Sequence, residues 1–289
     1  MKILVTGGYG QLGLSIKKLS ANYPDWDWIF TDYDELDITK KNLVEKFIGG
    51  NDFTHLINCA AYNEVDMAEK DVKRARLINQ TGVKYLAQIS SKHKLSFIHI
   101  STDYVFDGNN FRPYSEYDVP NPKNIYGLTK LEGEMAAMDK CRNTIIIRTS
   151  WLYSEFGKNF LKTMLRLSSE RSQINVISDQ IGTPTYAGDL AQTIFMIIEQ
   201  KRSVPEPQIY HYSNEGVASW YDFAYEIISL TGKACEIMPV PTEEYPLPAS
   251  RPFYSVLSKI KIKNDFGVTI PNWRNSLHKC LDQLQSQPI

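Results

Sequence analysis

A tyrosine and a lysine lie four residues apart in the segment Tyr126-Gly127-Leu128-Thr129-Lys130. If this segment is helical, the phenol and the ammonium group share one face of the helix. A lysine cation favours the phenolate, so we expect Lys130 to lower the pKa of Tyr126 from its ordinary value of about 10. A phenol tuned in this way can exchange a proton with a substrate oxygen near neutral pH. The same spacing occurs by chance in many helices, so the pair needs further support.

That support comes from a hydroxyl residue upstream. Thr102 lies in Ser101-Thr102-Asp103-Tyr104-Val105-Phe106-Asp107-Gly108, directly after the apolar run 96–100. A hydroxyl at the carboxyl end of a buried strand can donate a hydrogen bond to a carbonyl oxygen bound there. Together with Tyr126 it could polarise a ketone while a dinucleotide delivers hydride. Asp103 either orients these groups or is an ordinary turn acid, and local turn chemistry leaves both interpretations open.

The place for a dinucleotide is a glycine-rich turn near the N-terminus, Thr6-Gly7-Gly8-Tyr9-Gly10-Gln11-Leu12-Gly13. An apolar run precedes it and an apolar helical segment follows. Gly7 and Gly10 allow the backbone to turn sharply and approach a pyrophosphate at the helix N-terminus, and Gly13 permits close packing of helix on strand. In this context we expect a dinucleotide site that includes Gln11 and Leu12 as well as the glycines.

A carboxylate follows the second apolar run at the interval typical of a ribose-binding acid. Asp32 can accept hydrogen bonds from the adenosine ribose in that position. The alternative is a solvated turn acid, and Asp34 and Glu35 lie close by. No arginine follows Asp32 to bind a 2′-phosphate, because Tyr33 stands there, so NADH is favoured over NADPH without NADPH being removed as an alternative.

Short apolar runs alternate with amphipathic stretches through the first half of the chain, which predicts a parallel sheet covered by helices on both faces. The fold class expected is therefore α/β, a Rossmann-type doubly wound sheet. The predicted strands are Ile3–Val5, Trp28–Phe30, His55–Ile57, Ser96–Ile100 and Thr144–Ile147. The predicted helices are Gln11–Leu19, Lys40–Phe47, Ala75–His93 and Leu128–Met138.

Beyond Trp151 the alternation loosens, and prolines between Pro239 and Pro252 rule out a continuous helix there. We expect a smaller, discontinuous C-terminal lobe. A helix over Asp189–Gln200, capped at Gly188-Asp189, should return to the sheet. The predicted domains are 1–150 plus 178–212 for NAD(P) binding, and 151–177 plus 213–289 for substrate binding.

The composition favours a small-molecule ligand. With 32 Lys+Arg against 33 Asp+Glu the net charge is -1, so we expect neither nucleic acid nor membrane as a partner. The N-terminal apolar run lacks the features of a signal peptide, which predicts a cytoplasmic protein. The 4 cysteines are dispersed and the histidines lack ligand spacing, so no zinc site or disulfide framework is expected.

At this point the chain resembles the extended short-chain dehydrogenase/reductase superfamily, and within it the enzymes that reduce dTDP-linked 4-keto-6-deoxy sugars. The resemblance covers nearly the full length. It is carried by the glycine turn, the Thr102 segment, the Tyr126–Lys130 pair and a set of short motifs. These motifs are Leu36-Asp37-Ile38-Thr39, Asn58-Cys59-Ala60-Ala61-Tyr62, Val65-Asp66-Met67-Ala68-Glu69, Arg148-Thr149-Ser150-Trp151, Asp179-Gln180-Ile181-Gly182-Thr183-Pro184-Thr185 and Arg251-Pro252.

The resemblance implies hydride transfer from NADH or NADPH to the C4 ketone of the sugar. Tyr126 would supply the proton, Lys130 would hold both Tyr126 and the nicotinamide ribose, and Thr102 would bind the ketone oxygen. Further residues implied at the cofactor are Asp37, Ile38, Cys59, Ala60, Ala61, Tyr62 and Asn63. Those implied at the sugar are Val65, Asp103, Tyr104 and Trp151. For Trp151 the alternative is an ordinary core aromatic.

Relatives place a glutamate shortly after the glycine turn, where some use it for a divalent ion at a dimer contact. Ser15 stands there in this chain. We therefore predict no metal, and a homodimer, if formed, would not be linked by one.

Three other functions share some of these residues. A dehydratase would resemble its relatives in having an acid pair after the threonine, but Tyr104 follows Asp103. An epimerase could remove and return hydride in the same site without net consumption of NAD(P)H. A non-catalytic nucleotide-binding subunit, such as the regulatory subunit of methionine adenosyltransferase, is the third, and the intact Thr102, Tyr126 and Lys130 argue against it.

Overall fold

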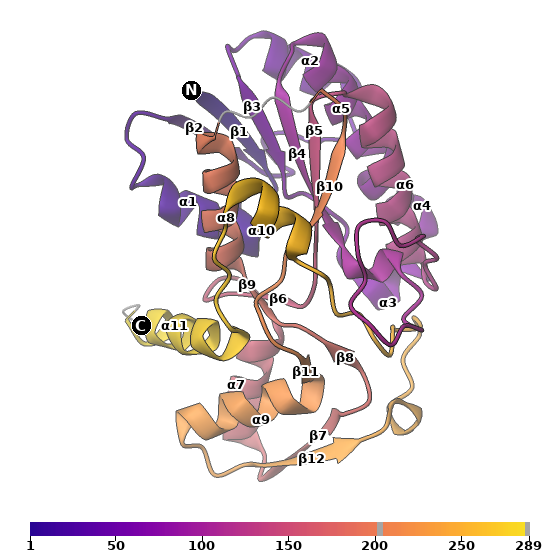
Figure 1. The fold of residues 1–289 in the computed structure, drawn as a ribbon, viewed down its shortest axis with the longest axis vertical. Helices are drawn as coiled ribbons and strands as arrows, with labels where there is room; N and C mark the ends of the chain where they lie inside the picture. Colours follow the sequence, from indigo (N-terminus) through magenta and orange to yellow (C-terminus); the bar gives the residue numbers. More distant parts are fainter. Residues whose placement is uncertain (201–204, 287–289) are drawn as a thin grey trace.

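A computed structural model describes residues 1–200 and 205–286. Its centre is a 6-stranded sheet in which every strand pair is parallel (Figure 1). The strands, from one edge to the other, are β10 (Gln208–His211), β5 (Thr144–Thr149), β4 (Ser96–Thr102), β3 (His55–Asn58), β1 (Lys2–Thr6) and β2 (Asp27–Thr31). The five strands predicted from apolar runs all lie in this sheet, because a strand covered on both faces must be apolar along its length.

Helices cover both faces of the sheet, which confirms the predicted Rossmann-type α/β class. On one face α1 (Gln11–Ser20), α8 (Ala187–Glu199) and α10 (Ile260–Phe266) share a core with Ile3, Val5 and Ile57. On the other face α2 (Lys41–Gly49), α5 (Val83–Lys92) and α6 (Ile125–Lys140) pack on Leu4 and Leu56. Successive side chains of a strand point to opposite faces, so neighbouring residues of β1 and β3 enter different cores.

The order of the strands opens a crevice at the carboxyl edge of the sheet. β1 pairs with β2 on one side and with β3 on the other. The connections that leave β1 and β3 therefore run to opposite faces, which is the arrangement that leaves a ligand crevice in doubly wound folds. The turn at Gly7 and the loop that begins at Cys59 border this point.

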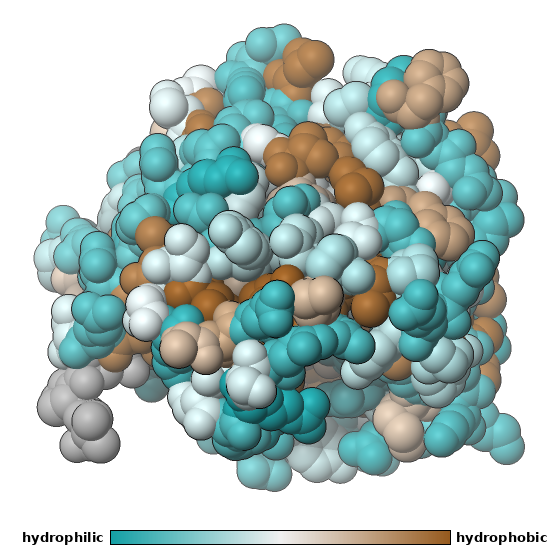
Figure 2. All heavy atoms as spheres, turned by 90° about the horizontal axis from the view of Figure 1, so that it is seen from below, coloured by the Kyte–Doolittle hydropathy of each residue, from teal (hydrophilic) through white to brown (hydrophobic). Residues whose placement is uncertain are grey.

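The rest of the chain forms a smaller lobe below the sheet (Figure 1). The parallel pair β7 (Gln173–Ile177) and β12 (Glu236–Val240) lies with α7 (Phe160–Glu170), α9 (Trp220–Thr231) and α11 (Trp273–Gln285). Its core includes Leu161, Phe223 and Trp273. Seen from this end, the surface is mostly hydrophilic with a broken band of apolar side chains (Figure 2). The proposed domain boundaries stay a prediction.

Short elements complete the chain and carry much of the site. The short helices are α3 (Val65–Ala68), α4 (Val72–Arg76), the π-helix η1 (Leu77–Gly82) and the 3-10 helices η2 (Asp103–Val105) and η3 (Thr242–Glu244). The short strands are β6 (Leu152–Tyr153), β8 (Ile181–Gly182), β9 (Thr185–Tyr186) and β11 (Ala218–Ser219). No helix within the described ranges combines the length and the apolar character needed to cross a membrane.

Two expectations about helices are wrong in detail. The predicted helix Ala75–His93 is divided by the π-helical turn η1. The predicted cap at Gly188-Asp189 is also wrong, because α8 begins at Ala187 and its N-cap is Tyr186. The carboxylate of Asp189 accepts instead from Asn214 and Ser276. These contacts join the first turn of α8 to the loop after β10 and to α11.

Candidate active site

The glycine turn after β1 is shaped by close backbone contacts. Gly7 has φ +67°, and a Cβ there would lie 2.5 Å from the backbone nitrogen of Ala60. A Cβ on Gly13 would meet the backbone of Gly7 and Gly8. The helix that follows begins at Gln11, and its N-cap Gly10 offers no side-chain cap, so the N–H groups of its first turn have no acceptor within the helix. This is a site where an anionic group can lie against the backbone.

A pocket of about 220 Å³ opens beside the turn. Nine of the residues predicted for the cofactor line it: Gly7, Gly10, Asp32, Asp37, Ile38, Cys59, Ala60, Ala61 and Asn63. Tyr33, Leu36, Thr39 and Ile78 also line it and were not predicted. The predicted residues Gln11, Leu12, Gly13, Tyr62 and Lys130 are outside the lining, since Leu12 is buried in the core and Gly13 serves the packing of α1. The cradle at Gly7 and its lining fit a dinucleotide.

Asp32 organises the turn that it was predicted to serve. Its carboxylate accepts from the backbone N–H of Tyr9 at 3.0 Å and of Tyr33 at 2.8 Å. Glu35 accepts from the backbone N–H of Asp32 and from the hydroxyl of Tyr9. Asp32 thus stabilises the turn, as the alternative interpretation expects, and it also lines the pocket. The two interpretations of Asp32 are therefore compatible.

The loop after β3 is fastened by a residue that the sequence did not single out. Asn79, which is fully buried in η1, accepts from the backbone N–H of Tyr62 at 2.8 Å and donates to its carbonyl at 3.2 Å. The same amide donates to the hydroxyl of Thr129 on α6. The π-helical turn brings this side chain between the loop and α6, and such turns are frequent at functional sites. A lone asparagine in a helical segment gives no signal of this task in the sequence.

Thr102, Tyr126 and Lys130 meet at the carboxyl end of β4. Burial raises the pKa of Tyr126 to about 12, and the hydrogen bond with Thr102 opposes this rise. Lys130 is buried and its Nζ donates to the carbonyl of Ile100 at 2.6 Å. Burial lowers the pKa of Lys130 to about 8, and the charge of Glu134 opposes this. The expected lowering of the Tyr126 pKa by Lys130 is therefore wrong in this structure, because burial raises that pKa and the amine of Lys130 is turned to a backbone carbonyl.

The start of α6 fixes where Tyr126 lies. Asn124 caps the helix by accepting from the backbone N–H of Gly127 at 2.7 Å. The carboxylate of Glu69 accepts from the backbone N–H of Ile125 at 2.8 Å. A Cβ on Gly127 would collide with the carbonyl of Tyr104, so only glycine lets α6 approach η2 this closely. Tyr126 is thereby brought beside Thr102 and Asp103.

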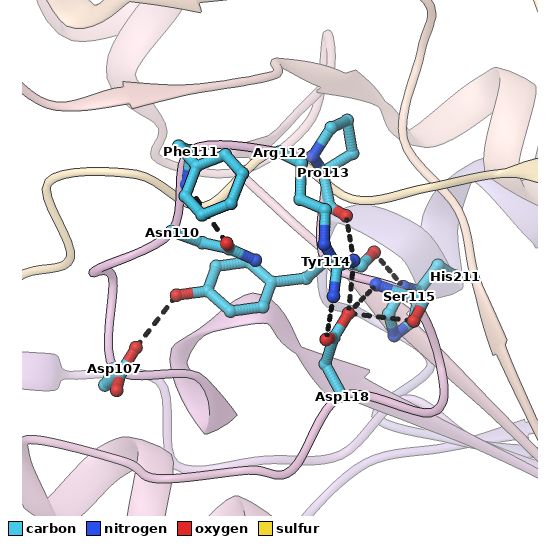
Figure 3. A network of polar contacts seen from close by, with 9 residues as sticks. All are labelled: Asp107, Asn110, Phe111, Arg112, Pro113, Tyr114, Ser115, Asp118 and His211. Atoms are coloured by element: carbon cyan, nitrogen blue, oxygen red, sulfur yellow. Dashed lines mark hydrogen bonds and ion pairs between the residues drawn. The ribbon is translucent and has the colours of Figure 1, made fainter.

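A network of polar contacts holds the loop that joins Asp103 to α6 (Figure 3). The hydroxyl of Tyr114 donates to Asp107 at 2.9 Å, and Asp118 accepts from Arg112 at 2.7 Å. The carbonyl of Tyr114 lies 3.1 Å from His211 Nδ1 on β10. The loop is thus fastened to the edge strand of the sheet, and this limits how far the start of α6 can move.

Aromatic and charged residues of the smaller lobe stack on one another and contact residues near Tyr126. Trp151, with φ +47°, stacks on Trp220 at 3.6 Å between ring centroids. Arg251 forms a two-pronged ion pair with Asp66 of α3 and also bonds to Tyr104. Tyr104 in turn meets the ring of Tyr126 edge-on at 5.6 Å. Neither the Trp151–Trp220 stack nor the Asp66–Arg251 pair was anticipated, since the partners are far apart in the sequence.

Gln11 also has a task that its predicted role does not describe. Its side-chain oxygen accepts from Ser154 and Asn159, and its amide donates to the carbonyl of Leu152. The first turn of α1 is therefore bonded to the segment that enters the smaller lobe. The hydroxyl of Ser15 donates to the backbone carbonyl of Gln11 at 2.9 Å. Residues 1–200 and 205–286 bring no three His, Cys, Asp or Glu side chains together as a metal site.

Comparison with known proteins agrees with this geometry over nearly the whole chain. The model of the RmlD substrate binding domain matches residues 1–286. A dTDP-4-dehydrorhamnose reductase from Aggregatibacter actinomycetemcomitans is 41% identical, over 96% of this chain and 97% of its own. A UDP-glucose 4-epimerase structure from Thermus thermophilus, with NAD, shares 18% identity at a TM-score of 0.82 over 100% of both chains, which shows the fold alone.

Two crystal structures of dTDP-4-dehydrorhamnose reductases are closely similar. The Clostridium acetobutylicum structure has a TM-score of 0.94 and 40% identity, and the alignment covers 99% of this chain and 100% of that one. The Bacillus anthracis structure, in complex with NADP, has a TM-score of 0.93 and 36% identity over 98% and 99% of the two chains. Since family model and relatives extend over nearly the full length, this protein belongs to the RmlD substrate binding domain family, together with the dTDP-4-dehydrorhamnose reductases.

Proposed function

We propose that the protein reduces the C4 ketone of dTDP-4-dehydro-6-deoxy-L-mannose to give dTDP-L-rhamnose, with NADH or NADPH as reductant. The observation that carries the proposal is the meeting of Thr102, Tyr126 and Lys130 at the carboxyl end of β4, where the charge of Lys130 acts on Cys59 of the pocket lining. The names of the full-length relatives support the substrate. The NADP complex of the Bacillus anthracis relative supports a nicotinamide dinucleotide as the cofactor.

The residues divide the work of the reaction. The reduced nicotinamide, when bound, supplies hydride to the ketone carbon. Tyr126, held protonated by its raised pKa, gives a proton to the ketone oxygen. The Thr102 hydroxyl donates a hydrogen bond to the same oxygen as negative charge develops there. Lys130, whose amine donates to the carbonyl of Ile100 in this structure, would hold Tyr126 and the nicotinamide ribose in place.

The remaining predicted residues hold the two ligands. The backbone at Gly7, Gly10, Gln11, Leu12 and Gly13 receives the pyrophosphate. The adenosine half lies along Asp32, Asp37 and Ile38, and the loop from Cys59 through Tyr62 to Asn63, with Ala60 and Ala61, covers the nicotinamide half. Val65, Asp103, Tyr104 and Trp151 frame the sugar. The lining of the pocket supports the assignment of the adenosine half.

The test is turnover by the purified chain. Each mole of dTDP-4-dehydro-6-deoxy-L-mannose should oxidise one mole of NADH or NADPH. The oxidation is measured as the loss of reduced-nicotinamide absorbance. An epimerase would act without net oxidation, and a binding subunit would bind NADH without oxidising it. A panel of other nucleotide-linked ketosugars with each cofactor settles the specificity. Sedimentation velocity of the same sample tests whether the chain forms a homodimer.

Tyr126→Phe is the first variant to make. Removal of the phenol hydroxyl takes away the proton donor, so kcat should fall by roughly 10²- to 10⁴-fold. Cofactor affinity, measured by quenching of protein fluorescence with NADH, should be unchanged. Tyr117→Phe is the control because Tyr117 is 84% exposed. Full activity in Tyr126→Phe would remove Tyr126 from the proposed role.

A further inference from the structure

The hydroxyl of Thr102 has a single hydrogen and more than one acceptor for it. Its oxygen accepts from the backbone N–H of Tyr104 at 3.2 Å, and it donates to Oδ1 of Asp103 at 3.1 Å. The phenol of Tyr126 also lies close enough for this hydroxyl to lower its pKa. A hydroxyl has one donor and two acceptor positions. While its hydrogen is directed at Asp103, it is not available to the ketone oxygen of a substrate.

Asp103 is placed to decide this direction. Asp103 is the first residue of η2, directly after β4, and it is only 2% exposed. Within the described residues its second carboxyl oxygen, Oδ2, completes no hydrogen bond, and neither does the hydroxyl of Ser255, which lies near enough to lower the pKa of Asp103. Burial outweighs these contacts and raises the pKa of Asp103 to about 6. The acid form is therefore accessible near neutral pH.

We propose that Asp103 is a positioning residue whose protonation state sets the direction of the Thr102 hydroxyl; this rests on the reductase function proposed above. As a carboxylate, Asp103 accepts the hydroxyl hydrogen and withholds it from the ketone. As a carboxylic acid, it donates its own proton to Thr102 Oγ1, where the Tyr104 N–H occupies the other acceptor position. The hydroxyl hydrogen is then free for the ketone oxygen beside Tyr126.

Other titratable groups around Asp103 act in different ranges of pH. Tyr104 and Tyr126 face it from η2 and α6; burial raises the pKa of both phenols, and the charge of Asp103 raises it further. On the wall formed by the smaller lobe, Ser255 faces it with an uncharged hydroxyl. Arg251 and Asp66 lie one contact further out and act on Tyr104. The group that changes charge between weakly acidic and neutral pH in this cluster is Asp103.

The activity should fall as the pH rises, because the acid form of Asp103 is the one that leaves the Thr102 hydroxyl free for the ketone. Wild-type kcat/KM should decrease as pH rises through the pKa of Asp103, by roughly tenfold per unit at most, because one protonation state is active. Asp103→Asn replaces the acid by an amide that can donate at every pH, and Asp103→Ala removes the competing acceptor. Both variants should lose this decrease, so that kcat/KM changes by less than about twofold from about pH 5 to about pH 7.5.

The experiment measures kcat/KM for NADPH oxidation with dTDP-4-dehydro-6-deoxy-L-mannose over this range, after subtraction of the rate without enzyme. Asp107→Asn is the matched control on the same loop, because hydrogen bonds hold the pKa of Asp107 below its ordinary value, so that it stays a carboxylate over this range. It should keep the wild-type profile. In the background of Thr102→Val, Asp103→Asn should have no further effect on the profile, since the hydroxyl that it directs is gone. Fluorescence quenching by NADH shows that each variant is folded.

The outcomes separate cleanly. A flat wild-type profile, a decrease that persists in Asp103→Asn, or a folded Asp103→Asn that binds NADH but is inactive at every pH would each overturn the proposal. A decrease lost in both Asp103 variants and kept in Asp107→Asn supports it. If wild type oxidises no NADPH with this substrate at any pH, the proposed function itself fails.

Discussion

Gly7 shows how much of the cofactor turn is fixed by the absence of one side chain. Its φ of +67° disfavours any other residue, and a Cβ would press on Ala60. Gly232, which ends α9, has nearly the same φ of +63°, but nothing lies within 4 Å of a Cβ there. The two glycines therefore share a left-handed φ and differ in the closeness of another backbone.

We expect Gly232→Ala to destabilise the fold by about 1 kcal/mol, the strain of a left-handed residue. Gly7→Ala should cost about 2 to 4 kcal/mol, because strain and collision add. Only Gly7→Ala should weaken NADH binding, since only it displaces the Ala60 loop. Urea unfolding and fluorescence titration with NADH measure the two effects. Equal loss of affinity in both variants would show that strain alone, without the contact to Ala60, matters.

The helices and strands of the sheet were predictable, while the elements that orient the site were not. Parallel strands are buried on both faces, so the strands His55–Asn58 and Thr144–Thr149 can be predicted from apolar runs in the sequence. The π-helical turn at Leu77–Gly82 leaves no comparable pattern, because it changes the backbone register without changing which residues are apolar.

The same difference applies within the site. The four-residue spacing placed Tyr126 and Lys130 on one helix near Thr102. It could not indicate that Lys130 donates to Ile100, because backbone acceptors have no sequence signature. Nor could it place Trp220 against Trp151 or Arg251 against Asp66, which depend on how the smaller lobe folds back.

Asn79 offers a test of the π-helical turn as an element. Asn79→Ala leaves the backbone groups of Tyr62 and the hydroxyl of Thr129 without their partner, at a cost of about 1 to 3 kcal/mol. The loop after β3 should loosen, and NADH affinity should fall. Asn51→Ala is the control, because Asn51 forms hydrogen bonds with Lys2 and Phe47 near the amino ends of the strands, away from the site. If both variants lose stability yet neither loses affinity, Asn79 serves the fold and not the cofactor loop.

The two lobes of the molecule are joined near the site by an ion pair and by the side chain of Gln11. Arg251 reaches Asp66 at 2.7 Å, and Gln11 bonds to Asn159 at 2.9 Å. These contacts hold the smaller lobe toward the sheet and toward helix α6, which carries Tyr126. A substrate bound between them would depend on this spacing, so the ion pair should affect substrate affinity as well as stability.

Arg251→Met should therefore raise KM for the nucleotide sugar and lower stability by about 0.5 to 1 kcal/mol at neutral pH, the usual range for a partly exposed pair. The hydrogen bonds from Arg251 lower the pKa of Asp66. A lowered folded-state pKa gives stability that is present above the unfolded value of about 4 and is lost below it. The deficit of the variant, measured by urea unfolding, should shrink as the pH falls through that range.

Arg166→Met provides the comparison, because Arg166 pairs with Glu170 within α7 and joins no lobes. It should lower stability slightly and leave KM for the sugar unchanged, since the spacing across the crevice is unaffected. A rise in KM confined to Arg251→Met means that the Asp66–Arg251 pair sets the width of the site. An unchanged KM in Arg251→Met, or a stability deficit that persists at low pH, would mean that Gln11 and the packing of the lobes set it without the ion pair.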